Sequence, residues 1–306
     1  STLADWVGQS STLLRPLVNA LQRYVFAGHK VHGDDTPVPV LAPGNGRTRT
    51  GRLWTYVRDD RPAGSHAPSA VWFGYSPDRK GEHPVAHLKK FSGTLQADGY
   101  AGFNALYARG RIQEAACWAH VRRKFYEVHQ AQASTLAAEA LNRIGLLYGI
   151  ESGLRGKPPN VRCAERRSRA APLLADFHIW LSATLAQLSQ KSALAQAIRY
   201  ALARWAALTR YCDDGTIEID NNAAERALRT VALGRKNYLF AGSDRGGERA
   251  AAIYSLIGTA KLNDLDPQAY LSHVLDRIAE HPVNQIDQLL PWNVAGTLAP
   301  AWRQAA

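Results

Sequence analysis

The order of strand-like and helix-like segments restricts the fold more than any other feature of this sequence. Between residues 28 and 76, apolar and polar residues alternate in three runs rich in Val, Thr, Trp and Tyr, with turn-forming residues between the runs. A short helical pattern, a fourth strand, a second helical pattern and a fifth strand follow before residue 117. Hairpins join antiparallel strands and strand–helix–strand units join parallel ones, so this order predicts an α/β fold with a mixed sheet.

The pattern changes after Cys117. Val121, Phe125 and Val128 have the spacing of a buried helix face, and the next part of the chain consists almost entirely of helix-forming Ala, Leu, Arg and Gln. A further helix, a glycine-rich segment and a long apolar helix follow it. We predict an N-terminal helix at residues 1–27, a core at residues 28–130 and 214–263, a helical insertion at residues 131–213, and a C-terminal helix and tail at residues 264–306.

Composition narrows the class of protein. The apolar fraction of 46% is that of a folded globular chain, and no apolar run approaches the length of a membrane span. The formal net charge of +11 favours a polyanionic partner such as nucleic acid, although charge alone does not separate DNA from RNA or from a membrane surface. Three widely spaced cysteines, Cys117, Cys163 and Cys212, favour a reducing cytoplasm over a disulfide framework.

The sequence contains no methionine, not even at its first position. We interpret the chain as a fragment or a processed product, and we expect a further segment in front of residue 1.

Three acidic residues lie in three separate segments that could converge in the fold. Asp34 lies in the first strand run beside Asp35, Asp98 follows the fourth strand, and Glu225 lies at the start of a helix. Carboxylates from separate elements are what a protein needs to hold two Mg²⁺ or Mn²⁺ ions for phosphodiester chemistry.

Each of these residues also has a purely structural explanation. Asp34 could be a solvated residue at a strand terminus, because acidic residues are depleted inside strands. Asp98 precedes Gly99, and Asp-Gly is a common turn pair. Asn222 and Glu225 match a capping box, in which Glu225 would bond back to the amide of Asn222.

The segment CWAHVRRKF combines a Cys-x-x-His spacing with a run of basic residues. Cys117 and His120 could be half of a zinc site, but no second Cys/His pair has a suitable spacing. The structural alternative is a buried Cys117 and a packing Trp118 ahead of a solvated basic helix. The glycine-rich segment GSDRGGER resembles a phosphate-cradling loop but lacks the Lys-Ser/Thr ending of a nucleotide-binding P-loop, so ATP and GTP are not predicted ligands.

Seven segments together resemble the transposases of the bacterial insertion-sequence-66 family, in the family's order between about residues 28 and 295. They are HGDDTPVPVLAPG, GRLWTYVRDDRP, LQADGYAGFNALY, CWAHVRRKFYE, IDNNAAERALR, GRKNYLFAGSDRGGERAA and LDPQAYLSHVL. The resemblance implies a ribonuclease-H-like core, with a mixed five-stranded sheet and a helical insertion before the last catalytic helix. It also implies an N-terminal DNA-binding region that this chain lacks.

Carried over position by position, the resemblance implies a catalytic Asp-Asp-Glu triad of Asp34, Asp98 and Glu225, which holds two Mg²⁺ or Mn²⁺ ions. Asp35 stands where relatives often have Glu, which favours Asp34 as the ligand. Cys117 and His120 match a Cys-x-x-His signature that follows the second Asp in some transposase families. Asp35, Cys117 and His120 are therefore candidate assisting residues.

The resemblance implies metal-dependent DNA strand cleavage and strand transfer of an insertion sequence. Two alternatives stay open: a catalytically silent DNA-binding remnant of a mobile element, and a cellular nuclease or resolvase of the same fold. The implied partners are transposon ends, target DNA, further copies of the chain and accessory proteins of the element, at the nucleoid in a bacterial cytoplasm. The candidate DNA-binding residues are Arg122, Arg123, Lys124, Arg226, Arg229, Arg235, Lys236 and Arg245.

Overall fold

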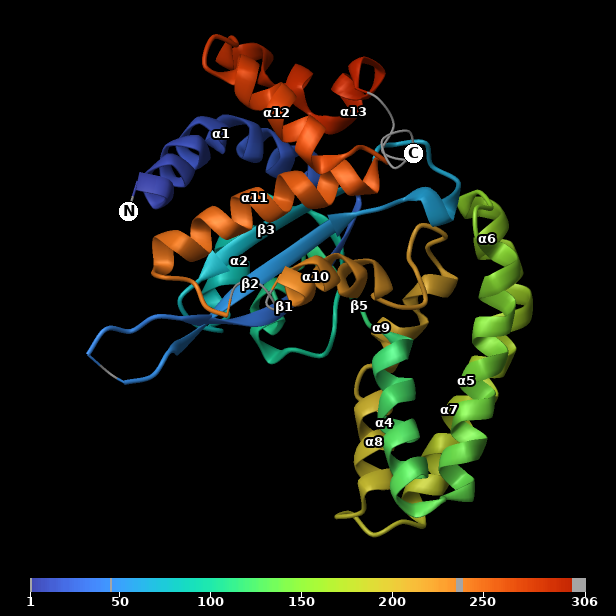
Figure 1. The fold of residues 1–306 in the computed structure, drawn as a ribbon. Helices are drawn as coiled ribbons and strands as arrows, with labels where there is room; N and C mark the ends of the chain where they lie inside the picture. The colour runs from blue at the N-terminus through green and yellow to red at the C-terminus, as the bar shows by residue number, and fades with distance from the viewer. Residues whose placement is uncertain (1, 45, 235–238, 299–306) are drawn as a thin grey trace, which may run out of the picture.

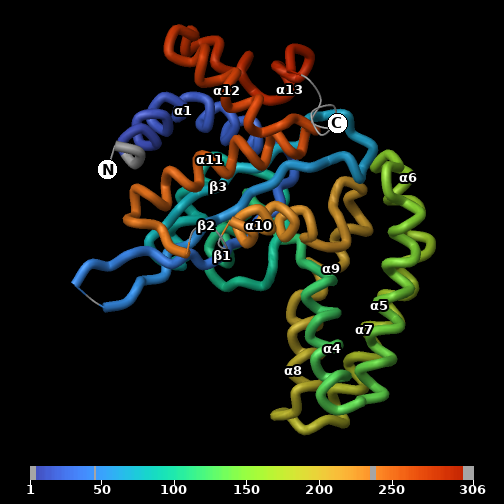
Figure 2. Tube along the Cα trace, viewed as in Figure 1, coloured from blue at the N-terminus to red at the C-terminus, as the bar shows by residue number. Residues whose placement is uncertain are grey.

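The structure is a computed structural model that describes residues 2–44, 46–234 and 239–298 (Figures 1 and 2). Its centre is a five-stranded sheet with the order β3-β2-β1-β4-β5. β1, β2 and β3 are antiparallel neighbours, whereas β4 and β5 run parallel to β1, so the predicted mixed five-stranded sheet is confirmed. The strands are β1 (Lys30–Val40), β2 (Arg49–Arg58), β3 (Ala70–Ser76), β4 (Gly93–Gln96) and β5 (Ile112–Ala115).

The two faces of the sheet belong to different apolar clusters. Successive side chains of a strand point to opposite faces, and the strand register places Asp34 and Val38 on the same face as Leu53 and Phe73. This face packs against α10 (Asn222–Gly234) and α11 (Asp244–Leu262) in one apolar cluster.

The opposite face carries Trp54, Tyr56 and Trp72. It belongs to a second apolar cluster that reaches the N-terminal and C-terminal helices, which lie together along one side of the sheet in Figure 1. The helices with residues in or beside this cluster are α1 (Thr2–Phe26), α2 (Glu82–His87), α3 (Asn104–Tyr107), α12 (Pro267–Ile278), α13 (Pro291–Val294) and α11, whose Leu256 and Ala260 belong to it.

Six helices form a lobe that projects from the end of the sheet nearest β5 (Figures 1 and 2). They are α4 (Trp118–Gln132), α5 (Thr135–Leu154), α6 (Pro159–Glu165), α7 (Ala171–Ala186), α8 (Ala193–Leu202) and α9 (Trp205–Thr209). We call residues 118–212 the helical lobe. It has its own apolar core, in which Trp118 packs against Phe177 and Trp205. Because Trp118, Val121 and Phe125 belong to this core, α4 packs with the lobe, although it lies ahead of the insertion predicted at residues 131–213.

None of the helices in the described part of the chain is both long and apolar enough to cross a membrane.

Candidate active site

Asp34 lies in the middle of β1, on the sheet face that α10 covers. Its Oδ1 accepts a hydrogen bond of 2.7 Å from the main-chain amide of Asp35. Burial raises the pKa of Asp34 to about 7, and the negative charges of Asp98, Asp35 and Glu225 raise it further, whereas the Asp35 amide opposes the shift. The solvated strand terminus is therefore the wrong explanation for Asp34, because the residue lies inside β1 and its carboxyl group is mostly buried.

Asp35 occupies the opposite face and has a different environment. Its Oδ2 accepts a hydrogen bond of 3.0 Å from Arg52, and its Oδ1 accepts two from Arg79, at 3.0 and 2.8 Å. The Asp35 side chain is only 2% exposed. The Arg79 guanidinium also lies 4.1 Å from the centre of the Tyr100 ring, in the loop that follows β4. Asp35 is thus a buried ion-pair partner that joins β1 to the loop carrying Asp98.

Asp98 is half-buried at the carboxyl end of β4, next to β1 in the sheet. Its Oδ1 accepts a hydrogen bond of 3.1 Å from the amide of Tyr100, so the predicted turn-forming role is confirmed. The negative charge of Asp98 nevertheless raises the pKa of Asp34, so the turn also brings this carboxylate near Asp34. The helical lobe holds the turn from the other side, because Arg204 donates a hydrogen bond of 3.0 Å to the carbonyl oxygen of Gly99.

Glu225 lies in the first turn of α10 and does not form the capping box. The Asn222 amide donates instead to Asp220 Oδ1, 3.1 Å away, and this leaves Glu225 free to point elsewhere. Glu225 Oε1 is buried and has no hydrogen-bond partner among the described residues. Its charge raises the pKa of both Asp34 and Cys117, which places the carboxylate between β1 and the start of α4.

Asn221 joins α10 to β1, a contact that the sequence did not reveal. Its Nδ2 donates a hydrogen bond of 2.8 Å to the carbonyl oxygen of Gly33, and its Oδ1 lies 3.1 Å from His32 Nδ1. Both Asn221 and His32 are buried. Asn221 belongs to the IDNNAAERALR segment, but no spacing rule marks an asparagine as a strand–helix tether.

Cys117 and His120 lie beside Glu225. Cys117 immediately precedes α4, and its Sγ accepts a hydrogen bond of 3.2 Å from the amide of Asn221. Burial raises the pKa of the Cys117 thiol to about 12. His120 Nδ1 lies 3.8 Å from Glu225 Oε1. The predicted burial of Cys117 and packing of Trp118 are confirmed, and the Cys-x-x-His unit additionally faces the third acidic residue.

A buried network of ion pairs connects the helical lobe to the segment that leads into α10. Arg166 binds both carboxylate oxygens of Glu151, each at 2.7 Å. Arg162 donates to Glu218 Oε1 at 2.7 Å, and the main chain of Glu218 pairs with the side-chain amide of Gln96 at the end of β4. The network therefore fixes residues 213–221 between the lobe and the sheet.

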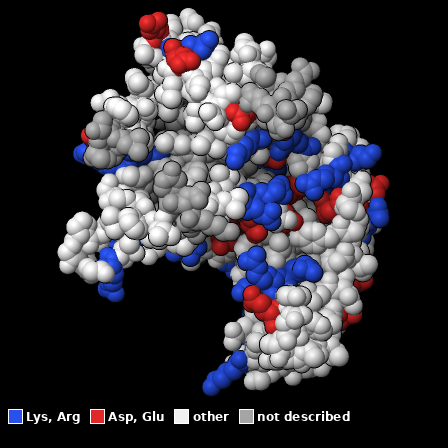
Figure 3. Space-filling view, in the orientation of Figure 1, with Lys and Arg blue, Asp and Glu red and all other residues white. Residues whose placement is uncertain are grey.

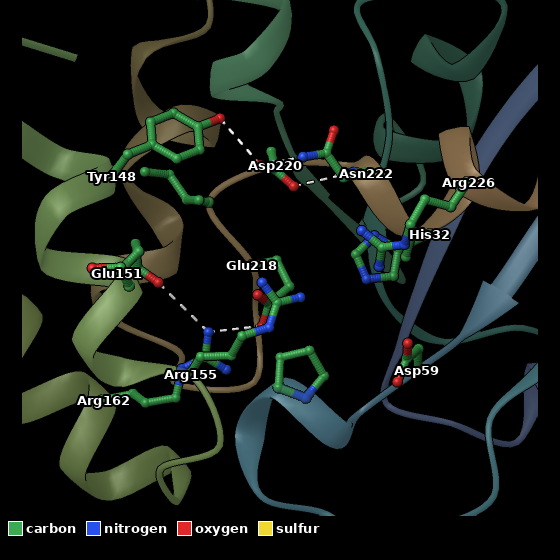
Figure 4. A pocket seen from close by; sticks show the side chains of 14 residues that line it. His32, Asp59, Tyr148, Glu151, Arg155, Arg162, Glu218, Asp220, Asn222 and Arg226 are labelled. Carbon is green, nitrogen blue, oxygen red and sulfur yellow. Dashed lines mark hydrogen bonds and ion pairs between the residues drawn. The ribbon is translucent and has the colours of Figure 1, made fainter. Parts of the chain in front are cut away.

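A polar cavity of about 180 Å³ lies between α5 and the start of α10 (Figure 4). Asp220 accepts hydrogen bonds there from Tyr148, at 3.1 Å, and from the Asn222 side chain, at 2.8 Å. The fully buried His32 also lines the cavity, and burial lowers its pKa to about 3, so this imidazole is neutral at physiological pH. In the described part of the chain, His32 Nε2 has no hydrogen-bond partner.

Basic side chains border the carboxylate cluster. Figure 3 shows Lys and Arg side chains gathered along the boundary between the sheet core and the helical lobe, with some Asp and Glu among them. The exposed members from the predicted set are Arg122, Arg123 and Lys124 on α4 and Arg226 and Arg229 on α10. Arg245, at the start of α11, is also exposed but lines a separate pocket with residues of α1 and β3. Arg235 and Lys236, also predicted to bind DNA, lie outside the described residues.

These features define a basic α/β protein in which Asp34 lies on a sheet face covered by the helix that carries Glu225, and Asp98 follows the neighbouring strand. The model of a family described as "Transposase IS66 family" matches residues 1–249, and that of the "IS66 C-terminal element" matches residues 255–292. The chain belongs to the IS66 transposase family.

Two proteins of Sinorhizobium fredii (strain NBRC 101917 / NGR234) are similar to this chain. The protein named "Uncharacterized protein y4hP" is 44% identical over 308 residues, which cover 95% of this chain and 55% of that protein. The protein named "Uncharacterized protein y4qI" is 41% identical over 302 residues, which cover 96% of this chain and 56% of that protein. The chain thus spans about half the length of these relatives.

Proposed function

We propose that this chain is the catalytic portion of a DNA transposase, with Asp34, Asp98 and Glu225 as its catalytic carboxylates. The placement of the three residues carries the proposal: Asp34 lies on the face of β1 that α10 covers, Asp98 follows the neighbouring strand β4, and Glu225 lies in the first turn of α10. The negative charges of Asp98 and Glu225 accordingly raise the pKa of Asp34. A buried cluster of like charges is unfavourable for folding, so such clusters point to a functional site. The strand order β3-β2-β1-β4-β5 supports the further proposal that the core is ribonuclease-H-like.

The donor atoms fit hard divalent cations. Asp34, Asp98 and Glu225 offer carboxylate oxygens, which Mg²⁺ and Mn²⁺ prefer as ligands. Asp34, Asp98 and Glu225 would hold two such ions. When bound, a pair of these ions activates the attacking oxygen and stabilises the leaving oxygen of a phosphodiester. Asp35 would not be a ligand, because Arg52 and Arg79 occupy both of its oxygens.

The rest of the chain would position the DNA and the carboxylates. The exposed Arg122, Arg123 and Lys124 on one side, and Arg226 and Arg229 on the other, would bind phosphate oxygens of the backbone. Asn221 and the Arg162–Glu218 pair would hold the start of α10 in place. The proposed partners are transposon ends and target DNA in a bacterial cytoplasm, with further copies of the chain in the active complex.

Mg²⁺-dependent nicking of a supercoiled plasmid tests the catalytic role. We expect Asp34→Asn to abolish nicking, because the amide removes a charged ligand. Asp35→Asn is the matched variant, because it changes the neighbouring carboxylate on the other face of the strand. It should retain most of the nicking activity per folded molecule. Circular dichroism of the same preparation gives the folded fraction.

Three outcomes would contradict this proposal. Equal loss of nicking from both variants would show that Asp35 takes part in the site. Wild-type protein that binds DNA but nicks none at any Mg²⁺ or Mn²⁺ concentration would identify a catalytically silent remnant. A strong preference for branched DNA or RNA–DNA hybrids over transposon ends would identify a nuclease or resolvase.

A further inference from the structure

We propose that Cys117, His120 and Glu225 form a binding site for a thiophilic divalent cation of the Zn²⁺ class, which ties the start of α4 to the start of α10. One potential ligand atom from each residue lies within 4.8 Å of the other two. The sequence predicted only half of such a site, and the third ligand comes from a distant helix. The inference rests on this geometry and shares Glu225 with the proposed triad: Oε1 would bind this cation, and the other carboxylate oxygen of Glu225 would remain for the proposed Mg²⁺ or Mn²⁺ ions.

The environment of the sulfur suits a metal-bound thiolate. Cys117 is 2% exposed, and its Sγ accepts a hydrogen bond of 3.2 Å from the amide of Asn221. Main-chain donors favour the charged form of the group that they contact. A cation that binds here would displace the thiol proton, because zinc ligands bind deprotonated.

The other two ligand atoms are buried, form an ion pair with each other and make no hydrogen bond among the described residues. His120 Nδ1 and Glu225 Oε1 both lack a hydrogen-bond partner among the residues that the structure describes, although they lie only 3.8 Å apart. Unsatisfied buried polar atoms are rare in folded proteins and call for an explanation such as an ion. One cation between the two atoms would satisfy both.

The spacing is close to that of a tetrahedral site. Metal–ligand distances of about 2.0–2.3 Å place neighbouring ligand atoms of a zinc site roughly 3.3–3.7 Å apart. The separation of 3.8 Å between His120 and Glu225 already approaches this value. Their side chains are 22% and 31% exposed, which leaves room for the small movement that would close the remaining gap to the sulfur. A sulfur, nitrogen and oxygen donor set selects Zn²⁺ or Co²⁺ over Mg²⁺, with water as a fourth ligand.

A second group with metal-ligand chemistry, Asp78, Glu82 and His83, lacks these properties. His83 Nε2 already pairs with Asp78 Oδ1 at 2.7 Å, and Glu82 is exposed. The polar atoms of this group are paired with one another or exposed to water. The Cys117 group, in contrast, contains buried atoms that make no hydrogen bond among the described residues.

Titration with Co²⁺ alone, followed by absorption spectroscopy, tests the site. We expect a thiolate-to-metal charge-transfer band together with visible bands of tetrahedral Co²⁺, and both should disappear when Zn²⁺ is added. Cys117→Ser should abolish the charge-transfer band. His120→Ala and Glu225→Gln should each weaken Co²⁺ binding by at least about tenfold, since even the loss of a supporting residue around a metal costs about that much.

Two controls keep the test specific. Cys163→Ser removes a thiol on α6 and should leave the bands unchanged. The Asp34→Asn, Asp98→Asn double variant should also keep them, because neither carboxylate belongs to this site. If Cys117→Ser fails to fold, His120→Ala decides the matter, since its side chain is partly exposed. The absence of a charge-transfer band in the wild-type protein, or its loss in Cys163→Ser, would overturn the proposal.

Discussion

Asn221 donates a hydrogen bond from its side-chain amide to the carbonyl oxygen of Gly33, 2.8 Å away. This contact joins the residue before α10 to the residue before Asp34, so one buried side chain sets the separation of the strand and the helix that carry two of the acidic residues. The arrangement has consequences for both stability and chemistry.

Replacing Asn221 with Ala should lower the free energy of unfolding and also impair nicking. The variant leaves the Gly33 carbonyl and the His32 ring without this partner, and an unsatisfied buried polar group costs about 1–3 kcal/mol. Urea unfolding measures the first effect and the plasmid assay the second. Asn222→Ala is a suitable control, because the Asn222 side chain bonds to Asp220 and not to β1. An unchanged nicking rate in Asn221→Ala would show that the tether is purely structural.

The stability of the metal-free protein should fall as the pH rises from about 4 to about 7. The pKa of Asp34 is raised to about 7, above its ordinary value, so folding favours the protonated form. The contribution of Asp34 to stability is therefore fully present below the ordinary carboxyl pKa and is lost as the pH approaches about 7. Each unit of pKa shift corresponds to about 1.4 kcal/mol. Urea unfolding in EDTA should show this decline in the wild-type protein and a smaller one in Asp34→Asn, and an equal decline in both would argue against the raised pKa.

The buried ion pair between Arg166 and Glu151 inside the helical lobe should contribute far more to stability than a similar pair on the surface. Arg166→Ala leaves the buried Glu151 without its bidentate partner and should cost about 3–5 kcal/mol. Arg167→Ala, the adjacent residue, breaks an exposed pair with Asp213 and should cost about 0–1 kcal/mol. Thermal or urea unfolding compares the two variants. Similar costs would mean that Glu151 is hydrated.

DNA binding should depend strongly on salt and weakly on sequence. Arg122→Ala or Arg226→Ala should weaken binding to every duplex and lower the salt slope by about one unit, the signature of a lost phosphate contact. Lys191→Ala, an exposed residue in the loop between α7 and α8, is a matched control. Fluorescence anisotropy at several salt concentrations measures both quantities.

The same protein should show little preference for transposon ends. Base edges are read by a helix or ribbon in a groove, and the sequence has no clear recognition-helix signature. Competition between end-containing and scrambled duplexes measures the preference. A hundredfold preference for the ends would place sequence recognition within this chain, with the helical lobe as the first candidate.

The sequence alone determined the order of strands and helices, because side-chain periodicity and turn chemistry act over a few neighbouring residues. The alternating run around Asp34 became β1, the Ala- and Leu-rich segment became the helical lobe, and Asp98 formed the predicted turn. Motif order also pointed to Asp34, Asp98 and Glu225 as a group.

Only the tertiary structure decided between alternative roles that the local sequence supports equally well. Asp34 and Asp35 are neighbours with the same chemistry, and what separates them is that α10 covers one face of β1 while Arg52 and Arg79 pair on the other. Glu225 does not form the capping box because the Asn222 amide donates its hydrogen bond to Asp220 instead. Glu225 also meets Cys117 and His120, far earlier in the chain. Such contacts depend on how buried surfaces of distant segments fit together, and no local pattern encodes that fit.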